Sequence, residues 1–295
     1  MNALKPQKGK AFDKLPKKTL DTFDTDTFLV GTKFDGNQIF IVKEGSEVSF
    51  YTSDWKPFYI AEVASNLRRM TTGSYIAIGE FMHDCEGKLG DRPKSAILTT
   101  YRTNFKKSID NNILDERKAN IRIFDFLDII ERQLMVTTVY ESRISLAAMS
   151  LANVPNIKVI RPQSMTGKEA IQYAKTLVNN GWEGIMLHRP HATYQLGKRV
   201  NYCVKLKYRK TADLKCIAVE PGEGKYTGMI GALLLQDSRG RRVSVGSGLT
   251  DGMRSYSDDY FLSQVIEIEY EQIMATYIQP TFLCKREDKT IEEID

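Results

Sequence analysis

A change in strand pattern near residues 208–213 limits the fold of this chain more than any other sequence feature. Before it, β-like runs are mixed with helical spacing, which is clearest at residues 132–152 and 168–180. After it come short strands separated by glycine turns, at residues 214–220, 231–236, 242–246 and 265–270. That second pattern is typical of a small antiparallel barrel. We therefore expect two domains joined by a hinge at residues 208–213.

Composition fits a globular protein and excludes several other classes. The chain has 295 residues, of which 42% are hydrophobic and 27% charged, so collagen, low-complexity disorder and disulfide scaffolds are excluded. The longest apolar run, residues 230–235, is far shorter than the ~18 residues of a membrane span. The four cysteines lie far apart and never in C-x-x-C spacing, which predicts reduced thiols in a cytoplasmic protein without a zinc site.

Positive charge is concentrated in two parts of the chain. The first twenty residues contain six lysines and one acid, which predicts a basic N-terminal arm over residues 1–27. Residues 188–210 contain seven basic residues and no acid, with three tyrosines among them. Cations interleaved with aromatics favour a polyphosphate or nucleic-acid backbone, whereas a solvated surface is the alternative for a charge run alone.

The start of the chain's β-rich region has the pattern of a meander. Asp35-Gly36-Asn37 is a turn signal between the β-like runs at residues 28–33 and 38–43, and a third run follows at 48–52. Lys33 stands at the end of the first run, immediately before this turn. A lysine held there is rigid and can serve a binding site.

Five further short motifs follow Lys33-Phe34-Asp35-Gly36 in a fixed order. They are Gly79-Glu80, Phe124-Asp125, Glu183-Gly184-Ile185-Met186, Lys205-Leu206-Lys207 and Arg286-Glu287-Asp288-Lys289. Each alone is compatible with salt-bridged surface residues. Their joint occurrence in this order is hard to obtain by chance, and in it the sequence resembles the small phage- and viral-type ATP-dependent DNA ligases of the covalent nucleotidyltransferase superfamily. Two further stretches, at residues 192–199 and 224–251, also resemble DNA ligases.

The resemblance implies an α+β fold and a domain order. The fold is a nucleotidyltransferase domain of ATP-grasp-like antiparallel sheets with flanking helices, plus a C-terminal OB-fold β-barrel. The expected boundaries are a basic arm at 1–27, the nucleotidyltransferase (adenylation) domain at 28–209 and the OB domain at 210–295. The implied reaction uses ATP and Mg²⁺ to seal nicked duplex DNA, and we expect a monomer without a membrane partner in the cytoplasm, in the nucleoid or in a phage-infected host cell.

The resemblance also assigns roles to residues. Lys33 attacks the α-phosphate of ATP, with Lys205 and Lys207 as the other catalytic residues. An amine is a nucleophile only when it is unprotonated, and Mg²⁺, Lys205 and Lys207 all disfavour an ammonium at Lys33. Glu80 and Glu183 are the implied metal ligands, since Mg²⁺ prefers oxygen. The implied nucleotide-binding residues are Thr32, Asp35, Gly36, Glu80, Phe124, Glu183, Met186, Arg286 and Lys289. The implied DNA-binding residues are Lys198, Arg199, Arg189 and Lys10.

Four positions depart from the family's usual residues. Gln38 and Ser53 stand where arginines are usual, His188 where a lysine is usual, and Gly31 where an acid is usual. An RNA ligase or a capping-type nucleotidyltransferase is the nearest alternative, although the R-x-D-K motif and residues 224–235 favour a DNA ligase. The alternative of another class is an inactive OB-type nucleic-acid-binding protein, which would have no use for the lysine and glutamate set.

Overall fold

The computed structural model describes residues 5–89, 101, 115–131, 133–273 and 275–295. The chain forms two compact units, Met1–Lys207 and Tyr208–Asp295, and each is described here by itself. The boundary therefore follows Lys207, two residues before the expected one. None of the described helices is long and apolar enough to cross a lipid bilayer.

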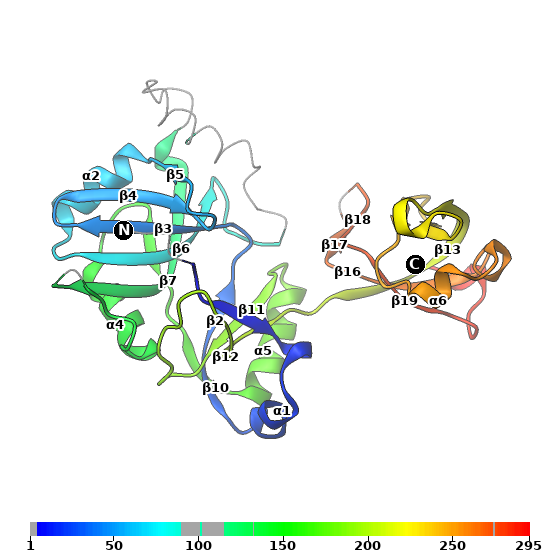
Figure 1. Cartoon of the computed structure of the whole chain (residues 1–295), viewed down its shortest axis with the longest axis horizontal. Helices are drawn as coiled ribbons and strands as arrows, with labels where there is room; N and C mark the ends of the chain where they lie inside the picture. The colour runs from blue at the N-terminus through cyan, green and yellow to red at the C-terminus, as the bar shows by residue number, and fades with distance from the viewer. Residues whose placement is uncertain (1–4, 90–100, 102–114, 132, 274) are drawn as a thin grey trace. The chain divides into compact units, whose positions relative to one another are not determined.

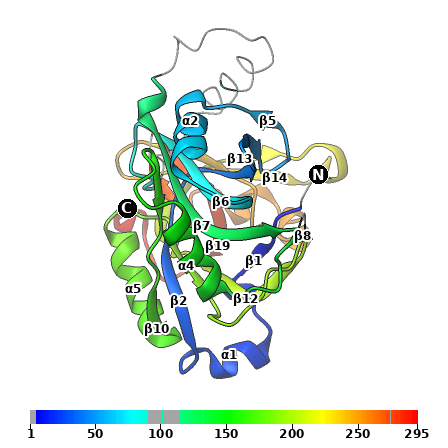
Figure 2. The ribbon, with the colours of Figure 1, turned by 90° about the vertical axis from the view of Figure 1, so that its left-hand side faces the viewer.

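The first unit contains two sheets (Figure 1). The five-stranded sheet has the order β1-β12-β11-β2-β10. Helix α5 (Gly167–Asn179) packs on β11, β2 and β10 (Figure 2) and begins with a capping box between Thr166 and Glu169. The strands are β1 (Lys8–Ala11), β2 (Thr27–Lys33), β10 (Gln163–Thr166), β11 (Gly184–His188) and β12 (Arg199–Leu206).

The expected N-terminal arm is part of this sheet, which corrects that prediction. Strand β1 pairs in parallel with β12, and its partners include Val204 and Lys205. Helix α1 (Lys17–Phe23) follows, with Phe23 buried against Phe28. Backbone hydrogen bonds and apolar burial thus hold a segment that lysine content alone marked as separate.

The second sheet of this unit has the order β5-β4-β3-β6-β7-β8, with β9 paired to β7. Its strands are β3 (Asn37–Glu44), β4 (Glu47–Thr52), β5 (Pro57–Phe58), β6 (Tyr75–His83), β7 (Ala119–Ile130), β8 (Gln133–Leu134) and β9 (Ile157–Val159). Helix α2 (Ala61–Met70) packs on β4, and α4 (Tyr140–Ser150) packs on β7 and β9. Helix α4 covers only part of the expected helix at 132–152, and residue 132 lies outside the described residues.

The expected meander at 28–52 is wrong in one respect. Strands β3 and β4 form a hairpin, but β2 pairs with β10 and β11 in the other sheet. The turn after Lys33 therefore carries the chain from one sheet to the other. A turn signal between two β-like runs does not tell a hairpin from such a crossing, because local sequence fixes the bend and not the partner strand.

The second unit is an antiparallel sheet of five strands in the order β15-β14-β13-β16-β19, with a β17–β18 hairpin. Its elements are β13 (Lys210–Pro221), β14 (Ile230–Gln236), β15 (Arg242–Val245), α6 (Asp251–Arg254), β16 (Val265–Tyr270), β17 (Gln272–Ile273), β18 (Tyr277–Ile278) and β19 (Thr281–Lys285). The expected hinge at 208–213 is mostly strand, since β13 begins at Lys210 and pairs with β16 from there. The four expected strands all exist, and β19 is an addition.

Candidate active site

The ends of three neighbouring strands meet at Lys33. Lys33, the last residue of β2, lies opposite Gly184, the first residue of β11. Next to it, Ile185 of β11 lies opposite Leu206, the last residue of β12. This register brings Glu183, Lys33 and Lys207 to one edge of the five-stranded sheet, although they are far apart in the sequence.

The Glu183 carboxylate joins the two lysines. One of its oxygens accepts a hydrogen bond from the Lys33 amine, and the other forms an ion pair with the Lys207 amine. The Glu183 side chain is only 7% exposed, so this carboxylate is nearly buried. The sequence predicted Glu183 as a metal or ribose ligand, and in the structure it bridges the two lysines.

Lys205 contributes a third cation beside this pair. It lies in β12 opposite Met186. Burial lowers the pKa of Lys205, and the positive charges of Arg199, Lys33 and Lys207 lower it further. The three lysines predicted to act together therefore interact electrostatically in the folded chain.

Only glycine fits at position 184, because the start of β11 lies very close to the end of β12. Its φ is +143°, and a Cβ at this position would lie 2.3 Å from the carbonyl oxygen of Leu206. Any side chain would push the end of β12 away from the start of β11. The glycine after Glu183 thus allows Lys207 to reach the carboxylate.

The turn after Lys33 contacts the other sheet. A Cβ on Gly36 would lie 2.6 Å from the Cγ of Glu80 and 2.7 Å from the carbonyl oxygen of Phe81, so only glycine fits there. The backbone N–H of Asp35 donates to the carbonyl of Gly87 at 2.9 Å. The structure therefore brings the Glu80 side chain to the turn that follows Lys33.

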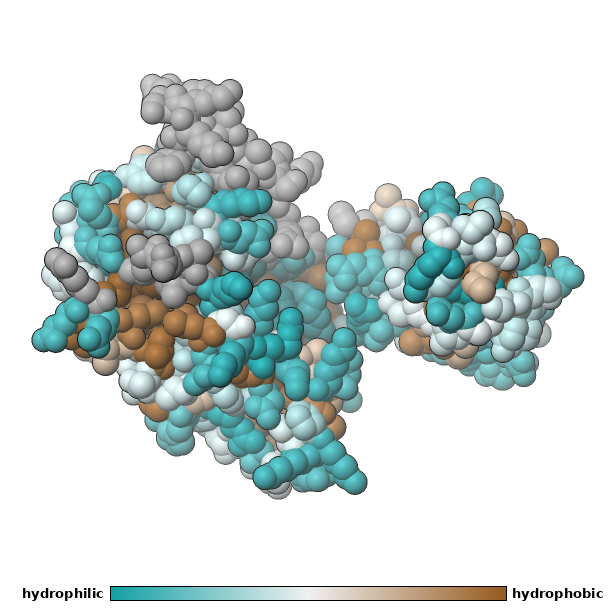
Figure 3. All heavy atoms as spheres, viewed as in Figure 1, coloured by the Kyte–Doolittle hydropathy of each residue, from teal (hydrophilic) through white to brown (hydrophobic). Residues whose placement is uncertain are grey.

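Phe124 is placed by a β-bulge. Ile78 pairs with Asp125 and Gly79 pairs with Ile123, which leaves Phe124 as the extra residue of β7. Its half-buried ring packs against the apolar cluster on one face of the β3-β6-β7 sheet. Figure 3 shows hydrophobic atoms gathered at the surface of the first unit where β6 and β7 lie in Figure 1.

Met186 and Thr32 lie in the other sheet, on β11 and β2. Met186 is opposite Gly31, and Thr32 is opposite Ile185. A Cβ on Gly31 would be 3.1 Å from the Cδ1 of Ile160, so an apolar group adjoins the position where relatives are expected to carry an acid.

A buried ionic and aromatic cluster supports the sheets. Arg143 is 1% exposed and forms a bidentate pair with Asp125, at 2.7 Å and 3.1 Å. His188 stacks on Tyr140 with ring centroids 3.9 Å apart, and its Nε2 lies 3.7 Å from the Sγ of Cys203. Burial lowers the pKa of His188 to about 4. Where a lysine is usual, this chain has a buried neutral imidazole.

Arg122 is a candidate that sequence reasoning missed. The backbones of Gln38, Glu80 and Arg122 form one row across β3, β6 and β7. The Arg122 guanidinium lies 5.7 Å from the centroid of Phe34, in the Lys33 turn. Burial lowers the pKa of Arg122. Arg122 therefore provides a positive charge in the same row as Gln38, the position where relatives are expected to carry an arginine. Ser53, the other such position, is next to Gln38, because its N–H donates to the Gln38 carbonyl at 3.1 Å.

The predicted DNA-binding residues fall into two groups. Lys198 and Arg199 are exposed at the start of β12, where Arg199 donates to the carbonyl of Gly9 at 2.9 Å, and Lys10 lies in the adjoining strand β1. Arg189 is instead paired with Asp26, 4.7 Å above the ring of Phe28. It also lines a cavity of about 600 Å³ together with Thr27, Pro190, His191, Ala192, Thr193 and Tyr202.

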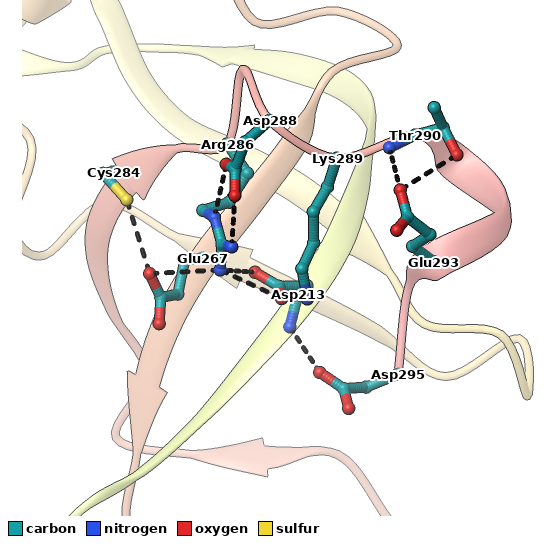
Figure 4. Close-up of polar contacts among 9 residues, drawn as sticks. All are labelled: Asp213, Glu267, Cys284, Arg286, Asp288, Lys289, Thr290, Glu293 and Asp295. Carbon is teal, nitrogen blue, oxygen red and sulfur yellow. Dashed lines mark hydrogen bonds and ion pairs between the residues drawn. The ribbon is translucent and has the colours of Figure 1, made fainter.

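Arg286 and Lys289 belong to the second unit. There the segment after β19 brings both cations to Asp213 of β13 (Figure 4). Hydrogen bonds from Arg286 lower the pKa of Asp288 to about 2. The R-x-D-K motif is therefore ordered on its own unit.

The donors in the first unit fit a magnesium site completed by a substrate. Among the described residues no group of three or more His, Cys, Asp or Glu side chains gathers as a metal cage. Glu183 pairs with the Lys33 amine, and the Glu80 side chain lies beside Gly36 in the turn that follows Lys33. Mg²⁺ is commonly held by one or two carboxylates together with substrate phosphates and water, so the pair fits that ion.

Models of two protein families match the chain. The model described as ATP dependent DNA ligase domain matches residues 6–207, and the one described as DNA ligase OB-like domain matches residues 221–284. Together with the strand topology, they confirm the expected nucleotidyltransferase domain followed by an OB-like domain.

Curated relatives are similar at about one residue in four. A probable DNA ligase of Beutenbergia cavernae is 25% identical, covering 98% of this chain and 59% of its own length. A DNA ligase of Methanocorpusculum labreanum is 27% identical, covering 91% of this chain and 53% of its own length. The chain spans about half the length of the curated relatives it matches.

Solved structures share the fold. One from a study of DNA binding with a minimal scaffold in Lig E DNA ligases has a TM-score of 0.70 at 18% identity, covering 97% of this chain and all of that chain (100%). The ligase domain of M. tuberculosis LigD has a TM-score of 0.52 at 16% identity, covering 99% of this chain and 98% of that chain.

Proposed function

The chain belongs to the ATP-dependent DNA ligase domain family, and we propose that it seals nicks between a 5′-phosphate and a 3′-hydroxyl in duplex DNA. The observation that carries this proposal is the Glu183 carboxylate that bridges Lys33 and Lys207, with Lys205 beside them. This cluster is built by the ends of three strands and by Gly184, where a Cβ would collide with the Leu206 carbonyl oxygen. An incidental surface ion pair requires no such arrangement.

In the first step, the Lys33 nitrogen attacks the α-phosphorus of ATP. The unprotonated nitrogen forms a bond to phosphorus, the bond from the α-phosphorus to the bridging oxygen of the β-phosphate breaks, pyrophosphate leaves, and the nitrogen releases one proton to solvent. Lys205 and Lys207 stabilise the charge that builds on the α-phosphate, since such transfers depend on positioning and on electrostatic stabilisation. Glu183, which contacts both amines, orients Lys33 and Lys207.

The nucleotide is held by residues from both sheets. Phe124 offers a half-buried ring for the adenine, and Met186 covers the other face of the base. Thr32, Asp35 and Gly36 line the turn around the nucleophile, and Glu80 and Glu183 would hold Mg²⁺ or the ribose hydroxyls. The metal neutralises phosphate charge when it is bound.

An oxygen of the 5′-phosphate at the nick then attacks the phosphorus of AMP, the phosphorus–nitrogen bond breaks, and Lys33 leaves as the free amine after taking up a proton. The 3′-hydroxyl attacks that phosphate, AMP leaves, and the strand is closed. Lys198, Arg199 and Lys10 offer positive charge to the DNA backbone on adjoining strands. Arg189, which is paired with Asp26, is the weakest of the four candidates. Arg286 and Lys289 hold the leaving pyrophosphate.

We place this reaction in DNA replication or repair, carried out by a monomer in the cytoplasm or nucleoid, including that of a phage-infected cell. The test is sealing of a labelled nicked duplex with ATP and Mg²⁺, with nicked RNA in parallel and Lys33→Ala as the control. Sealing of DNA by the native chain and not by Lys33→Ala supports the proposal. Sealing confined to RNA favours an RNA ligase. Binding of single strands without any transfer of AMP to the enzyme favours the inactive OB-type protein.

A further inference from the structure

The two cations of the R-x-D-K motif share one buried carboxylate. Arg286 Nη1 donates to both Asp213 oxygens at 3.3 Å, and the Lys289 amine donates to Asp213 Oδ2 at 2.5 Å (Figure 4). Asp213 is 8% exposed. It therefore faces both cations from inside the unit, near the start of β13.

Other acids contact only one of these cations. Asp288 is 67% exposed and accepts from the Arg286 guanidinium at 2.8 Å and 2.7 Å. Glu267, opposite Asp213 in β16, lies 3.7 Å from Arg286. Among the described residues, Asp213 is the carboxylate that contacts both Arg286 and Lys289. It can thus fix their spacing as well as their charge.

The main chain of Asp213 is fixed in turn by Asp295. The Asp213 N–H donates to Asp295 Oδ2 at 2.6 Å, and the Asp295 N–H donates to the Asp213 carbonyl at 3.0 Å. The Ser238 N–H donates to the Asp295 carbonyl at 2.7 Å. A turn at Ile291–Glu293, capped by Thr290 and Glu293, leads the chain back to this position. Residues 290–295 therefore form a strap across the start of β13.

This arrangement counters a cost that the motif would otherwise have. Two cations three residues apart on a loop repel each other and keep many side-chain conformations. A buried carboxylate that accepts from both lowers the repulsion and restricts the rotamers, while other donor hydrogens of the guanidinium and ammonium remain for a ligand. Two oriented cations suit the adjacent phosphates of a pyrophosphate group.

We propose that Asp213, held by the Asp295 strap, is a positioning residue that presents Arg286 and Lys289 as a pair to the pyrophosphate end of ATP. The inference rests on the proposed function, since it concerns the step in which pyrophosphate leaves. Asp213 acts through the two cations and touches no reacting atom. It should therefore affect only reactions in which pyrophosphate or ATP takes part.

The test compares reactions with and without pyrophosphate for Asp213→Asn and Asp295→Ala. Asp259→Asn is the matched control, because Asp259 is an exposed acid of the same unit. The first reaction is transfer of AMP from ATP to the enzyme, the second is its reversal by added pyrophosphate, and the third is sealing of a nick whose 5′-phosphate already carries AMP. Thermal unfolding of each variant reports the folded fraction.

For Asp213→Asn we expect a loss of about 10-fold or more in both AMP transfer and its reversal, with less than about 2-fold in the third reaction, as for a lost bond between charged groups. Asp295→Ala should show the same split with a smaller loss, and it carries the test if Asp213→Asn does not fold. Equal losses in all three reactions, or no loss in AMP transfer, would overturn this inference alone. A native chain that takes up no AMP would overturn the proposed function with it.

Discussion

Gly184 lies directly opposite Lys33 in the antiparallel pairing of β11 and β2, and this pairing brings Glu183 to the lysine amine. Lys33 and Gly184 are 151 positions apart in the sequence. On its other side, Gly184 lies against the carbonyl of Leu206 at the end of β12. The site therefore also depends on how closely the start of β11 can approach the end of β12.

Gly184→Ala tests that dependence. Its Cβ would lie 2.3 Å from the Leu206 carbonyl oxygen, so we expect a loss of stability well beyond the ~1–2 kcal/mol of a left-handed backbone alone, and a matching loss of AMP transfer to the enzyme. Gly45→Ala is the control, because Gly45 also has positive φ (+58°) but no atom within 4 Å of a Cβ. Urea unfolding of both variants measures the loss of stability, and labelling with ATP measures AMP transfer to the enzyme. Equal losses for the two variants would contradict the close-approach explanation.

The Arg143–Asp125 pair should be a major contributor to stability. Asp125→Asn leaves a nearly inaccessible guanidinium without its counter-charge, which costs about 3–5 kcal/mol. Asp115→Asn removes an acid from the exposed pair with Arg117 and should change the unfolding free energy little. Chemical denaturation of both variants is the measurement, and a similar small effect for each would show that the buried pair carries no such weight.

Buried His188 predicts a loss of stability in acid. The unfolded chain binds a proton near pH 6.5, whereas the folded chain binds it only near pH 4, because burial disfavours the imidazolium. Between these values the unfolded state holds more protons, so stability falls as the pH falls. The loss attributable to His188 should be about 2 kcal/mol between pH 7 and pH 5.

His188→Gln should remove this part of the pH dependence, even if it lowers stability overall. The neighbouring Tyr140, Cys203, Asp125 and Arg143 remain in both proteins, so the comparison isolates the imidazole. His191→Gln is the control, since His191 is 83% exposed. A pH slope that survives unchanged in His188→Gln would assign the acid sensitivity to another group.

Lys198 and Arg199 should set part of the salt dependence of DNA binding. Replacing both with alanine should weaken binding of a nicked duplex and lower the salt slope by about 2, one for each lost phosphate contact. Lys158→Ala is a suitable control, because Lys158 is an exposed cation on the other sheet. Fluorescence anisotropy across a salt series measures the slope, and an unchanged slope would remove the two residues from the DNA-binding surface.

Much of the fold was predictable from local sequence. The strand at residues 265–270 matches β16, and α5 differs from its expected range by one residue at each end, because apolar periodicity marks both elements in the sequence. Strand partners were not predictable. β2 looked like the first strand of a meander, but its partners β10 and β11 lie more than a hundred residues further on.

The candidate site divides in the same way. The order of motifs predicted Lys33, Glu183 and Lys207 as site residues, and the structure places these three side chains in contact around the Glu183 carboxylate. Arg122 carried no local signal, since a lone arginine in a strand reads as a surface residue and only the register with Glu80 reveals its place. Asp213 likewise lay in an expected hinge, and its contacts with Arg286 and Lys289 depend on pairing across the second unit.

The chemical state of Lys33 after exposure to ATP and Mg²⁺ tests the account most directly. Intact mass spectrometry and peptide mapping should find one AMP per chain, attached to Lys33 and absent from Lys33→Ala. Correctly folded native protein that acquires no AMP, or acquires it on another residue, would contradict the central claim.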